Sequence, residues 1–415
     1  MQTLLAESIR DTPEGREAEA ILRKCVHCGF CTATCPTYQL LGDELDGPRG
    51  RIYLIKQALE GNPVTAKTQA HLDRCLTCRA CETTCPSGVR YGRLVDIGRK
   101  FVEERVPRPI AENAKRRALA ALFPQTGLFG AMTQAGRLVR PFLPASLADK
   151  LPRAVPPAGE WPAPRHTRTM IALAGCVQPA LDPAINAAAA RVLDRLGVSL
   201  VEAPGAGCCG ALRFHLNFQD EARDDMRRVI DAWWPLVEAG AEAVAMTASG
   251  CATTVVEYGH LLADDPAYAA KAARIAAMTK DIAEIVAAEL PRLEPLLARA
   301  PRGGPKRVAF HPPCSLQHGL KLRGVTERVL AAAGFELAPV PDAHLCCGSA
   351  GTYSLLQPEL SAELKKAKLA ALASGGPEMI VSSNIGCLAH LAGGTELAAK
   401  HWIVALDERL AGSED

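Results

Sequence analysis

The feature that most restricts the fold of this chain is a cysteine motif that occurs twice near its N-terminus. Both copies have the form C-x2-C-x2-C-x3-C-P, and each cysteine of the second copy lies 50 residues after its counterpart. The cysteines of the two copies are Cys25, Cys28, Cys31 and Cys35, then Cys75, Cys78, Cys81 and Cys85. This run is the bacterial ligand pattern for [4Fe–4S] clusters, because closely spaced thiolates can reach three iron corners of one small cube. The sequence therefore predicts two such clusters and a role in electron transfer.

The fourth cysteine of each copy is expected to serve the other cluster. It follows a wider gap and precedes a proline, so the chain turns away, as it does in two-cluster ferredoxins. We predict that one cluster is held by Cys25, Cys28, Cys31 and Cys85. The other is then held by Cys75, Cys78, Cys81 and Cys35. Structural zinc also uses C-x2-C pairs, but it closes with four ligands and does not explain a third evenly spaced cysteine in both copies.

The composition is ordinary for a globular protein. Of the 415 residues, 48% are hydrophobic and 22% charged, and the formal net charge of +2 does not indicate nucleic acid as a partner. The N-terminal stretch lacks the features of a secretory signal, and no apolar run has the length of a membrane span. Sixteen cysteines in such a chain indicate metal ligands and not disulfides. We expect a cytoplasmic location, with peripheral attachment at the inner face of the cell membrane left open.

One segment departs from the neutral charge balance. Between Arg105 and Arg140 there are seven basic residues and one acid, Glu112, with apolar residues between them. A basic, apolar segment can lie on an anionic membrane or dock a partner. The simpler interpretation, which we favour, is a connecting helix with a solvated basic face.

The chain divides into four predicted ranges. Residues 1–105 are expected to form an α-helical ferredoxin domain with two [4Fe–4S] clusters, with helices over 14–24, 51–60 and 65–74. Residues 106–166 form a basic, proline-rich connector that ends in an extended linker. From residue 167, short apolar runs alternate with alanine-rich helices, which is typical of parallel sheets with crossover helices. We predict two cysteine-rich α/β domains, over 167–300 and 301–415.

The remaining eight cysteines indicate that this α/β region is a duplication. They form two sets whose members are offset by 138, 138, 138 and 136 residues, and a glycine follows the cysteine doublet in each set. The sets are Cys176, Cys208, Cys209 and Cys251, then Cys314, Cys346, Cys347 and Cys387. Most of these positions follow predicted strands, where open α/β sheets place their ligand sites.

The second group of cysteines leaves several functions open. They could bind a further iron–sulfur centre or zinc, form a redox dithiol, or pack as small core residues, and we favour metal or cluster ligation. A glycine pattern at Gly205, Gly207 and Gly210 matches a dinucleotide fingerprint. The second repeat keeps only the last of these glycines, so we reject a nucleotide site here.

The chain resembles a known family, the iron–sulfur subunits of glycolate oxidase (glycolate dehydrogenase). Relatives include the iron–sulfur subunit of anaerobic glycerol-3-phosphate dehydrogenase and the cysteine-rich subunit of heterodisulfide reductase. The matching segments are Gly47-Pro48-Arg49-Gly50-Arg51, Gly207-Cys208-Cys209-Gly210 and His311-Pro312-Pro313-Cys314-Ser315-Leu316-Gln317-His318. The resemblance covers nearly the whole chain.

The resemblance implies a division of labour. A separate flavoprotein subunit would oxidise glycolate to glyoxylate, and this chain would relay electrons toward a quinone-type acceptor within a hetero-oligomer. This chain would have no catalytic residue and no activity alone. The alternatives are the same role with D-lactate or glycerol-3-phosphate as donor, or a thiol–disulfide reductase.

The sequence departs from the family pattern at one point. In heterodisulfide reductase each repeat ends in Cys-x-x-Cys, but here Thr254 and His390 stand in the last place, which puts that relative's unusual non-cubane cluster in doubt. His390 could replace a thiolate, although we favour an ordinary loop histidine. His311 and His318 could donate hydrogen bonds to a cluster or simply pack. Arg49 and Arg51 could cap a carboxylate, contact a partner or be solvated.

Overall fold

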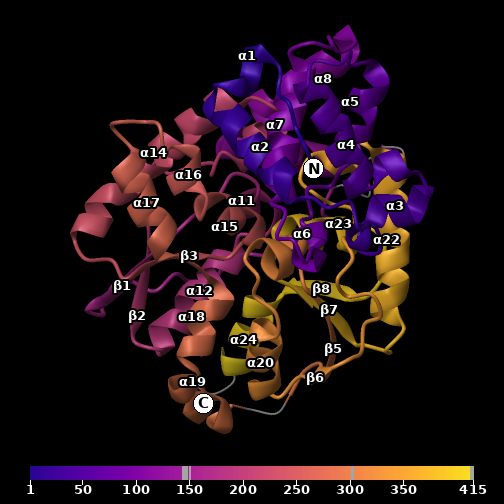
Figure 1. Cartoon of the computed structure of the whole chain (residues 1–415). Helices are drawn as coiled ribbons and strands as arrows, with labels where there is room; N and C mark the ends of the chain where they lie inside the picture. The colour runs from indigo at the N-terminus through magenta and orange to yellow at the C-terminus, as the bar shows by residue number, and fades with distance from the viewer. Residues whose placement is uncertain (143–147, 149–150, 301–302, 412–415) are drawn as a thin grey trace. The chain divides into compact units, whose positions relative to one another are not determined.

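The computed structural model describes residues 1–142, 148, 151–300 and 303–411 (Figure 1). Contacts divide the chain into two compact units. Unit 1 comprises Met1–Ala118 and His344–Leu364, and unit 2 comprises Leu119–Ala343 and Lys365–Asp415. The four predicted ranges stay a prediction, but the units cut across two of them. Residues 106–118 of the connector and residues 344–364 of the second cysteine-rich range belong to the unit that contains the N-terminus.

Unit 1 is built from short helices. Their bounds are α1 Glu7–Arg10, α2 Pro13–Lys24, η1 Phe30–Thr32, α3 Pro36–Leu41, η2 Glu44–Asp46, α4 Pro48–Leu59, α5 Ala66–Asp73, α6 Ala80–Thr84, α7 Tyr91–Glu103 and α21 Tyr353–Leu356. Helix α8, Ile110–Leu122, crosses the boundary between the units, as does α22, Pro358–Ala373. The helices predicted over 14–24, 51–60 and 65–74 are confirmed as α2, α4 and α5.

Local sequence explains where these helices begin and how closely they pack. Thr12 caps α2, since its hydroxyl accepts a hydrogen bond of 3.0 Å from the Gly15 amide, and Pro13 occupies the first helical position. Helices α4 and α7 pack tightly because Gly98 has no side chain. A Cβ atom there would lie 2.6 Å from Cγ1 of Ile55. The buried core of unit 1 includes Ile55 together with Cys25, Cys75 and Cys81.

Unit 2 contains the strands and the remaining helices. Its first part comprises α9 Thr126–Val139, η3 Arg140–Phe142, β1 Arg168–Ala172, α11 Gln178–Leu181, α12 Ala184–Arg195, β2 Val198–Glu202, α13 Ala211–His215, α14 Gln219–Glu238, β3 Ala243–Met246, α15 Ser249–Val255, α16 Tyr258–Leu261, α17 Ala269–Met278, β4 Thr279–Asp281, α18 Ile282–Ala288 and α19 Leu290–Arg299. Its second part comprises β5 Arg307–His311, η4 Ser315–Gly319, α20 Val325–Ala332, β6 Glu336–Leu337, β7 Met379–Ser382, α23 Ile385–Ala392, β8 Ala398–His401 and α24 Trp402–Ala411.

The two sheets of unit 2 have the same topology. One has the strand order β2-β1-β3-β4 and the other β6-β5-β7-β8, and neighbouring strands pair in parallel throughout the described residues. The predicted duplication and parallel α/β fold are therefore confirmed. Since every strand runs the same way, all the loops that follow the strands of one sheet leave from one edge.

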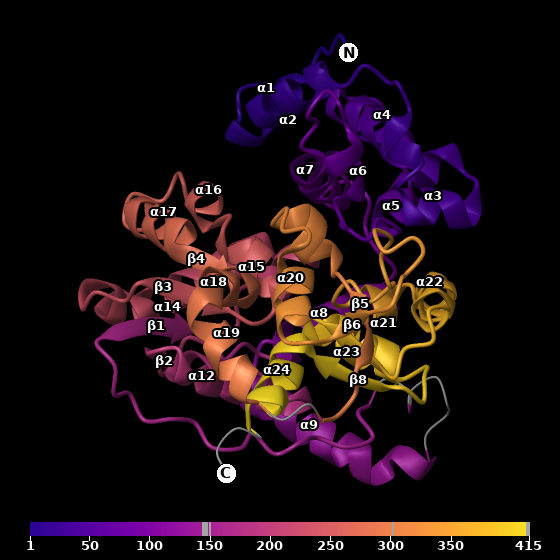
Figure 2. The same ribbon diagram turned by 90° about the horizontal axis from the view of Figure 1, so that it is seen from below.

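The sheets enclose a continuous core between them. Along β1, Met170 and Ala172 face this core, whereas Ile171 packs into a second core on the other side of the sheet. This alternation, apolar on both faces, is typical of a buried parallel strand. Helices α18, α20 and α24 lie between the two sheets (Figure 2), and α12 packs on α24. The two repeats of unit 2 therefore fold as one body.

The connector is partly helical. Helices α8 and α9 occupy its first half, and residues 151–166 form neither helix nor strand, as their proline content predicted. Arg108, which precedes α8, and Arg116 of α8 form ion pairs with Asp73 and Glu112 at 2.6–3.1 Å, so these basic residues neutralise acids. Within the described ranges, each helix is either too short or too polar to span a bilayer.

Candidate metal centres

Two cavities in unit 1 bring the predicted cysteines together. The first is lined by Cys25, Cys28 and Cys31 of the first motif and by Cys85 of the second. Its other lining residues include Val26, His27, Pro48, Arg49, Ile52 and Val89. Cys25 directly follows α2, Cys31 lies in η1 and Cys85 follows α6, so three short elements aim their thiols into one space. Cys28 is exposed, which leaves one edge of this cavity near solvent.

The second cavity is lined by Cys35 together with Cys75, Cys78 and Cys81. Cys35 immediately precedes α3, and Cys81 lies in α6. Cys81 also borders the first cavity. Apart from that shared cysteine, the exchange of the fourth cysteine between the two motifs follows the predicted pattern.

The loops around the cavities use the same backbone conformation in both motifs. His27 and Thr77, 50 residues apart, have φ of 56° and 53°, and Gly29 and Arg79 have φ of 85° and 60°. Left-handed backbone is unfavourable for residues other than glycine and collects at functional sites. In both loops it turns an amide toward sulfur: the Thr77 amide donates to Cys75 Sγ at 3.4 Å, and the His27 amide bonds Cys25.

The protonation of these thiols fits a cationic ligand. Burial raises the pKa of Cys31 to about 11 and also raises the pKa values of Cys25, Cys35 and Cys81. Neighbouring cysteines raise most of these pKa values further, because thiolates repel one another. Iron binds the thiolate, and its positive charge would remove both penalties.

Buried polar atoms at the cavities also lack acceptors or donors. Tyr91 lines both cavities, and its hydroxyl is buried without a hydrogen-bond partner of ordinary geometry among the described residues. Nε2 of His27, beside the first cavity, has none within the same set. A sulfur-rich group in each cavity would supply such partners. The residues present therefore fit a pair of iron–sulfur clusters.

A buried charged network supports the second cavity. Arg51 is 1% exposed, and its guanidinium donates to the Thr37 hydroxyl at 3.1 Å and reaches Oδ1 of Asp46 at 3.4 Å. Asp46 also pairs with Arg74 at 2.8 Å. The Thr37 hydroxyl lies 3.3 Å from Cys35 Sγ. Of the roles considered for Arg51, capping a carboxylate is therefore the one the structure shows.

The first set of cysteines in unit 2 gathers at one sheet edge. Cys176 follows β1, Cys208 and Cys209 follow β2, and Cys251 lies in α15 after β3. Their thiols form a chain of hydrogen bonds, in which Cys208 contacts Cys176 and Cys209, and Cys209 contacts Cys251. These bonds lower the pKa of Cys208 and raise those of Cys176 and Cys209. Four clustered sulfurs suit zinc or iron.

The glycine after each doublet has a shared structural reason. Gly210 and Gly348 have φ of 85° and 87°, so both are left-handed. A Cβ at Gly210 would lie 2.7 Å from the Ala222 carbonyl oxygen, and one at Gly348 would lie 2.7 Å from that of Ser361. In both repeats the turn after the doublet therefore lies against a later helix, α14 in the first repeat and α22 in the second, and only glycine fits.

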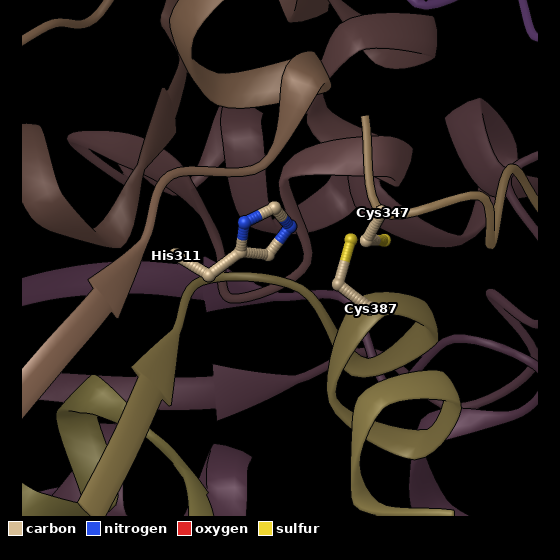
Figure 3. A group of neighbouring side chains, drawn as sticks. All are labelled: His311, Cys347 and Cys387. Atoms are coloured by element: carbon tan, nitrogen blue, oxygen red, sulfur yellow. The ribbon is translucent and has the colours of Figure 1, made fainter. Parts of the chain in front are cut away.

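The second set is divided between the units. Cys314 and Cys387 belong to unit 2, where the thiol of Cys387 lies within 4.8 Å of a ring nitrogen of His311 at the end of β5 (Figure 3). Asn384, which precedes α23, approaches Cys387 Sγ with its amide at 3.5 Å. Cys347, also labelled in Figure 3, belongs to unit 1. His311 is thus fully buried beside a thiol, and Asn384 is a neighbour that sequence reasoning did not single out.

The doublet segment of unit 1 lies near the second cluster motif. The Gly348 amide donates to Cys346 Sγ at 3.4 Å. The Tyr353 hydroxyl donates to the Arg74 carbonyl at 3.1 Å. Burial raises the pKa of Tyr353, and Cys75 and Cys346 raise it further, so both thiols lie near this phenol. Tyr91 and Tyr353 were missed by sequence reasoning, because neither stands in a ligand motif.

The two histidines considered as ligands have different surroundings. His318 is buried in η4, and its ring nitrogen lies 3.3 Å from a guanidinium nitrogen of Arg323. His390 is half-buried on α23, one turn after Cys387. A role for His390 as a ligand stays a prediction.

Comparison with known protein families gives two matches. A model described as "Cysteine-rich domain" matches residues 171–256 and 308–392. A model described as "4Fe-4S dicluster domain" matches residues 21–89. The first covers both repeats of unit 2, and the second covers both cysteine motifs of unit 1.

Relatives among curated proteins extend over the whole chain. The glycolate oxidase iron-sulfur subunit of Escherichia coli is 56% identical over 99% of this chain and 99% of its own length. The probable glycolate oxidase iron-sulfur subunit of Bacillus subtilis is 30% identical over 94% of this chain and 93% of its own. Lactate utilization protein A of Bacillus licheniformis is 28% identical over 52% of this chain and 88% of its own length.

Proposed function

Because this chain belongs to the family of glycolate oxidase iron–sulfur subunits, we propose that it carries electrons within a glycolate dehydrogenase complex. A separate flavoprotein subunit oxidises glycolate to glyoxylate, and this chain passes the electrons on toward a quinone. It is a non-flavin subunit of an oxidoreductase and has no activity alone. The observation that carries the proposal is the pair of neighbouring cavities, each of which is lined by its four predicted cysteines from both motifs.

The eight N-terminal cysteines are proposed as ligands of two [4Fe–4S] clusters. One cluster is held by Cys25, Cys28, Cys31 and Cys85, and the other by Cys35, Cys75, Cys78 and Cys81. When bound, such clusters accept and release single electrons. The chain's own contribution is to hold the thiols in two adjacent cavities, to direct backbone amides at sulfur, and to bury half of the ligand set.

The cysteine-rich sets are proposed to hold a further iron–sulfur centre. The cluster of sulfurs formed by Cys176, Cys208, Cys209 and Cys251 supports this for the first repeat. By the internal repeat we extend the assignment to Cys314, Cys346, Cys347 and Cys387. Zinc in the same sulfurs is the alternative, and metal analysis separates the two.

The experiment uses the complex purified without oxygen from cells that also express the flavoprotein subunit. We expect glycolate-dependent reduction of a quinone, about eight irons in the two cubanes, and low-potential signals in electron paramagnetic resonance. The purified chain alone should not oxidise glycolate. A colourless, iron-free complex that turns over normally would refute the proposal. If the complex oxidises D-lactate or glycerol-3-phosphate instead of glycolate, the proposed electron-transfer role stands and the proposed substrate is wrong.

A finer part of the proposal concerns where the complex works. Helix α9 and η3 expose a stripe of apolar residues, in which Leu138 is 80% and Phe142 88% exposed. The stripe contains Leu128, Met132, Leu138, Val139 and Phe142. Arg137 and Arg140 lie in the same segment, which contains no acid. This composition supports contact with an anionic membrane surface, where a quinone is found.

Vesicle flotation tests this contact. The complex should float with vesicles that contain anionic lipid and not with neutral vesicles. Replacing Leu138 and Phe142 with glutamate should abolish flotation and leave the cluster signals intact. Equal flotation of the changed and unchanged complexes would assign the stripe to a protein partner or to solvent.

A further inference from the structure

Tyr91 occupies a special position in unit 1. It begins α7, is 4% exposed, and lines both cluster cavities. Its hydroxyl is buried and makes no hydrogen bond of ordinary geometry within the described part of the chain. An unsatisfied buried hydroxyl costs about 1–3 kcal/mol. We therefore expect the Tyr91 hydroxyl to have a hydrogen-bond acceptor within the cavities.

The neighbours of Tyr91 limit what that acceptor can be. Arg51, Cys75 and Cys81 line the second cavity together with Tyr91, and each of them interacts electrostatically with the phenol. A guanidinium has no acceptor, so Arg51 cannot receive the proton. Among these three groups, the acceptors are therefore the sulfurs of Cys75 and Cys81, and both cysteines line the second cavity.

Tyr91 also keeps its proton. A phenol releases its proton only at about pH 10. At neutral pH the hydroxyl is therefore a donor. It cannot act as a second anion beside the thiolates.

The first cavity has no such donor at the corresponding place. The position 50 residues before Tyr91 is occupied by Leu41, which is 39% exposed. The two motifs are alike in their cysteines and in their loop backbone, but the phenol of Tyr91 has no counterpart at Leu41. The difference would make the two clusters unequal.

We propose that the Tyr91 hydroxyl donates a hydrogen bond to sulfur at the second cluster site and thereby raises the reduction potential of that cluster relative to the first. This inference rests on the clusters of the proposed function and adds a positioning residue to them. Reduction adds negative charge to a cluster, and a donor aimed at its sulfurs stabilises the reduced form more than the oxidised form.

The test is a redox titration of the anaerobically purified complex, followed by electron paramagnetic resonance. Tyr91→Phe removes only the hydroxyl. We expect the equilibrium constant for reduction of one cubane to fall about tenfold, which is 59 mV for a one-electron couple, while the other cubane and the iron content stay unchanged. Loss of one signal in Cys78→Ser identifies the second cluster. Tyr53→Phe, at a 49% exposed tyrosine of α4, is the matched control.

Two outcomes would overturn the inference. One is a Tyr91→Phe complex with full iron and unchanged potentials. The second outcome applies if the Tyr91→Phe complex does not load iron. A Tyr353→Phe complex is then grown with fluorinated tyrosine, whose hydroxyl is a stronger donor, and the reduction potential of its second cluster should be raised. An unchanged potential would contradict the inference. If the unchanged complex contains no iron, the proposed function fails first, so the two failures are distinguishable.

Discussion

The hydroxyl of Tyr353 donates a hydrogen bond of 3.1 Å to the backbone carbonyl of Arg74, the residue before Cys75. The two residues are 279 positions apart in the sequence. The bond links the segment that carries Cys346 to the loop that carries the second cluster motif, and both belong to unit 1. The second cysteine doublet therefore folds with the ferredoxin part of the chain, although its sequence repeat belongs to the α/β part.

Tyr353→Phe should loosen this segment. Loss of one hydrogen bond costs about 1 kcal/mol, so we expect faster backbone hydrogen exchange over residues 344–356. Hydrogen exchange followed by mass spectrometry measures this locally. Tyr53→Phe serves as the control, and equal exchange rates in both variants would contradict the assigned role of Tyr353.

Cys28→Ser should remove one cubane. Its thiol borders the first cavity, and serine is a poor iron ligand, so one low-potential resonance signal should disappear and quinone reduction by the complex should slow. Cys78→Ser, at the second cavity, should remove the other signal. Unchanged spectra in either variant would show that the ligand assignment is wrong.

Cys209→Ser and Cys347→Ser should spare both cubane signals and impair turnover. Neither cysteine borders the two cluster cavities, so the ferredoxin motifs keep their ligands. Resonance spectra and glycolate-dependent quinone reduction, measured on the same samples, separate the two effects. Normal turnover would mean that the cysteine-rich sets are purely structural.

An alanine in the left-handed backbone conformation costs about 1–2 kcal/mol of folding free energy. Gly210→Ala and Gly348→Ala should each destabilise the fold by more than this. At both sites the new Cβ would also meet a carbonyl oxygen at 2.7 Å. Gly240→Ala is the matched control, since its φ is 94° but its Cβ would meet no atom within 4 Å. Thermal unfolding of the three variants measures the difference. Equal losses of stability at all three sites would show that the close contacts do not add to the destabilisation.

Asp281→Asn should raise stability at neutral pH. Asp281 is 1% exposed, and burial raises the pKa of its carboxyl to about 7. In the unfolded chain this pKa is about 4. Between these two pKa values the carboxyl is protonated in the folded state and ionised in the unfolded chain. The free energy of unfolding therefore falls as pH rises, by roughly 1 kcal/mol per pH unit.

Asparagine keeps the helix cap of α18, because its side-chain oxygen can still accept from the Ala283 amide, but it does not titrate. The stability difference between the variant and the unchanged protein should therefore grow from pH 4 to pH 7. Denaturant unfolding at several pH values measures it. A difference that is independent of pH would rule out a raised pKa at this site.

Much of the site could be predicted from residue spacing and local pattern, and the rest depended on contacts between distant residues. The helices before Cys25 and Cys75 follow from local pattern and capping, and each cavity contains the four cysteines that the motif spacing assigned to it. Arg51 was left with several roles, because its burial depends on how α4 packs against neighbouring loops. Tyr91 and Tyr353 lie outside every recognised motif and gain their place only from packing.

The sequence by itself determined the candidate ligand cysteines, the two duplications and the order of the α/β elements, since these depend on residue spacing along the chain. Only the tertiary structure decided that residues 344–364 pack with the N-terminal unit, that a phenol stands beside both cavities, and that Asp46 and Arg51 are buried together. The physical reason is that burial and hydrogen-bond partners depend on which distant surfaces meet, and neither periodicity nor motif spacing encodes that directly.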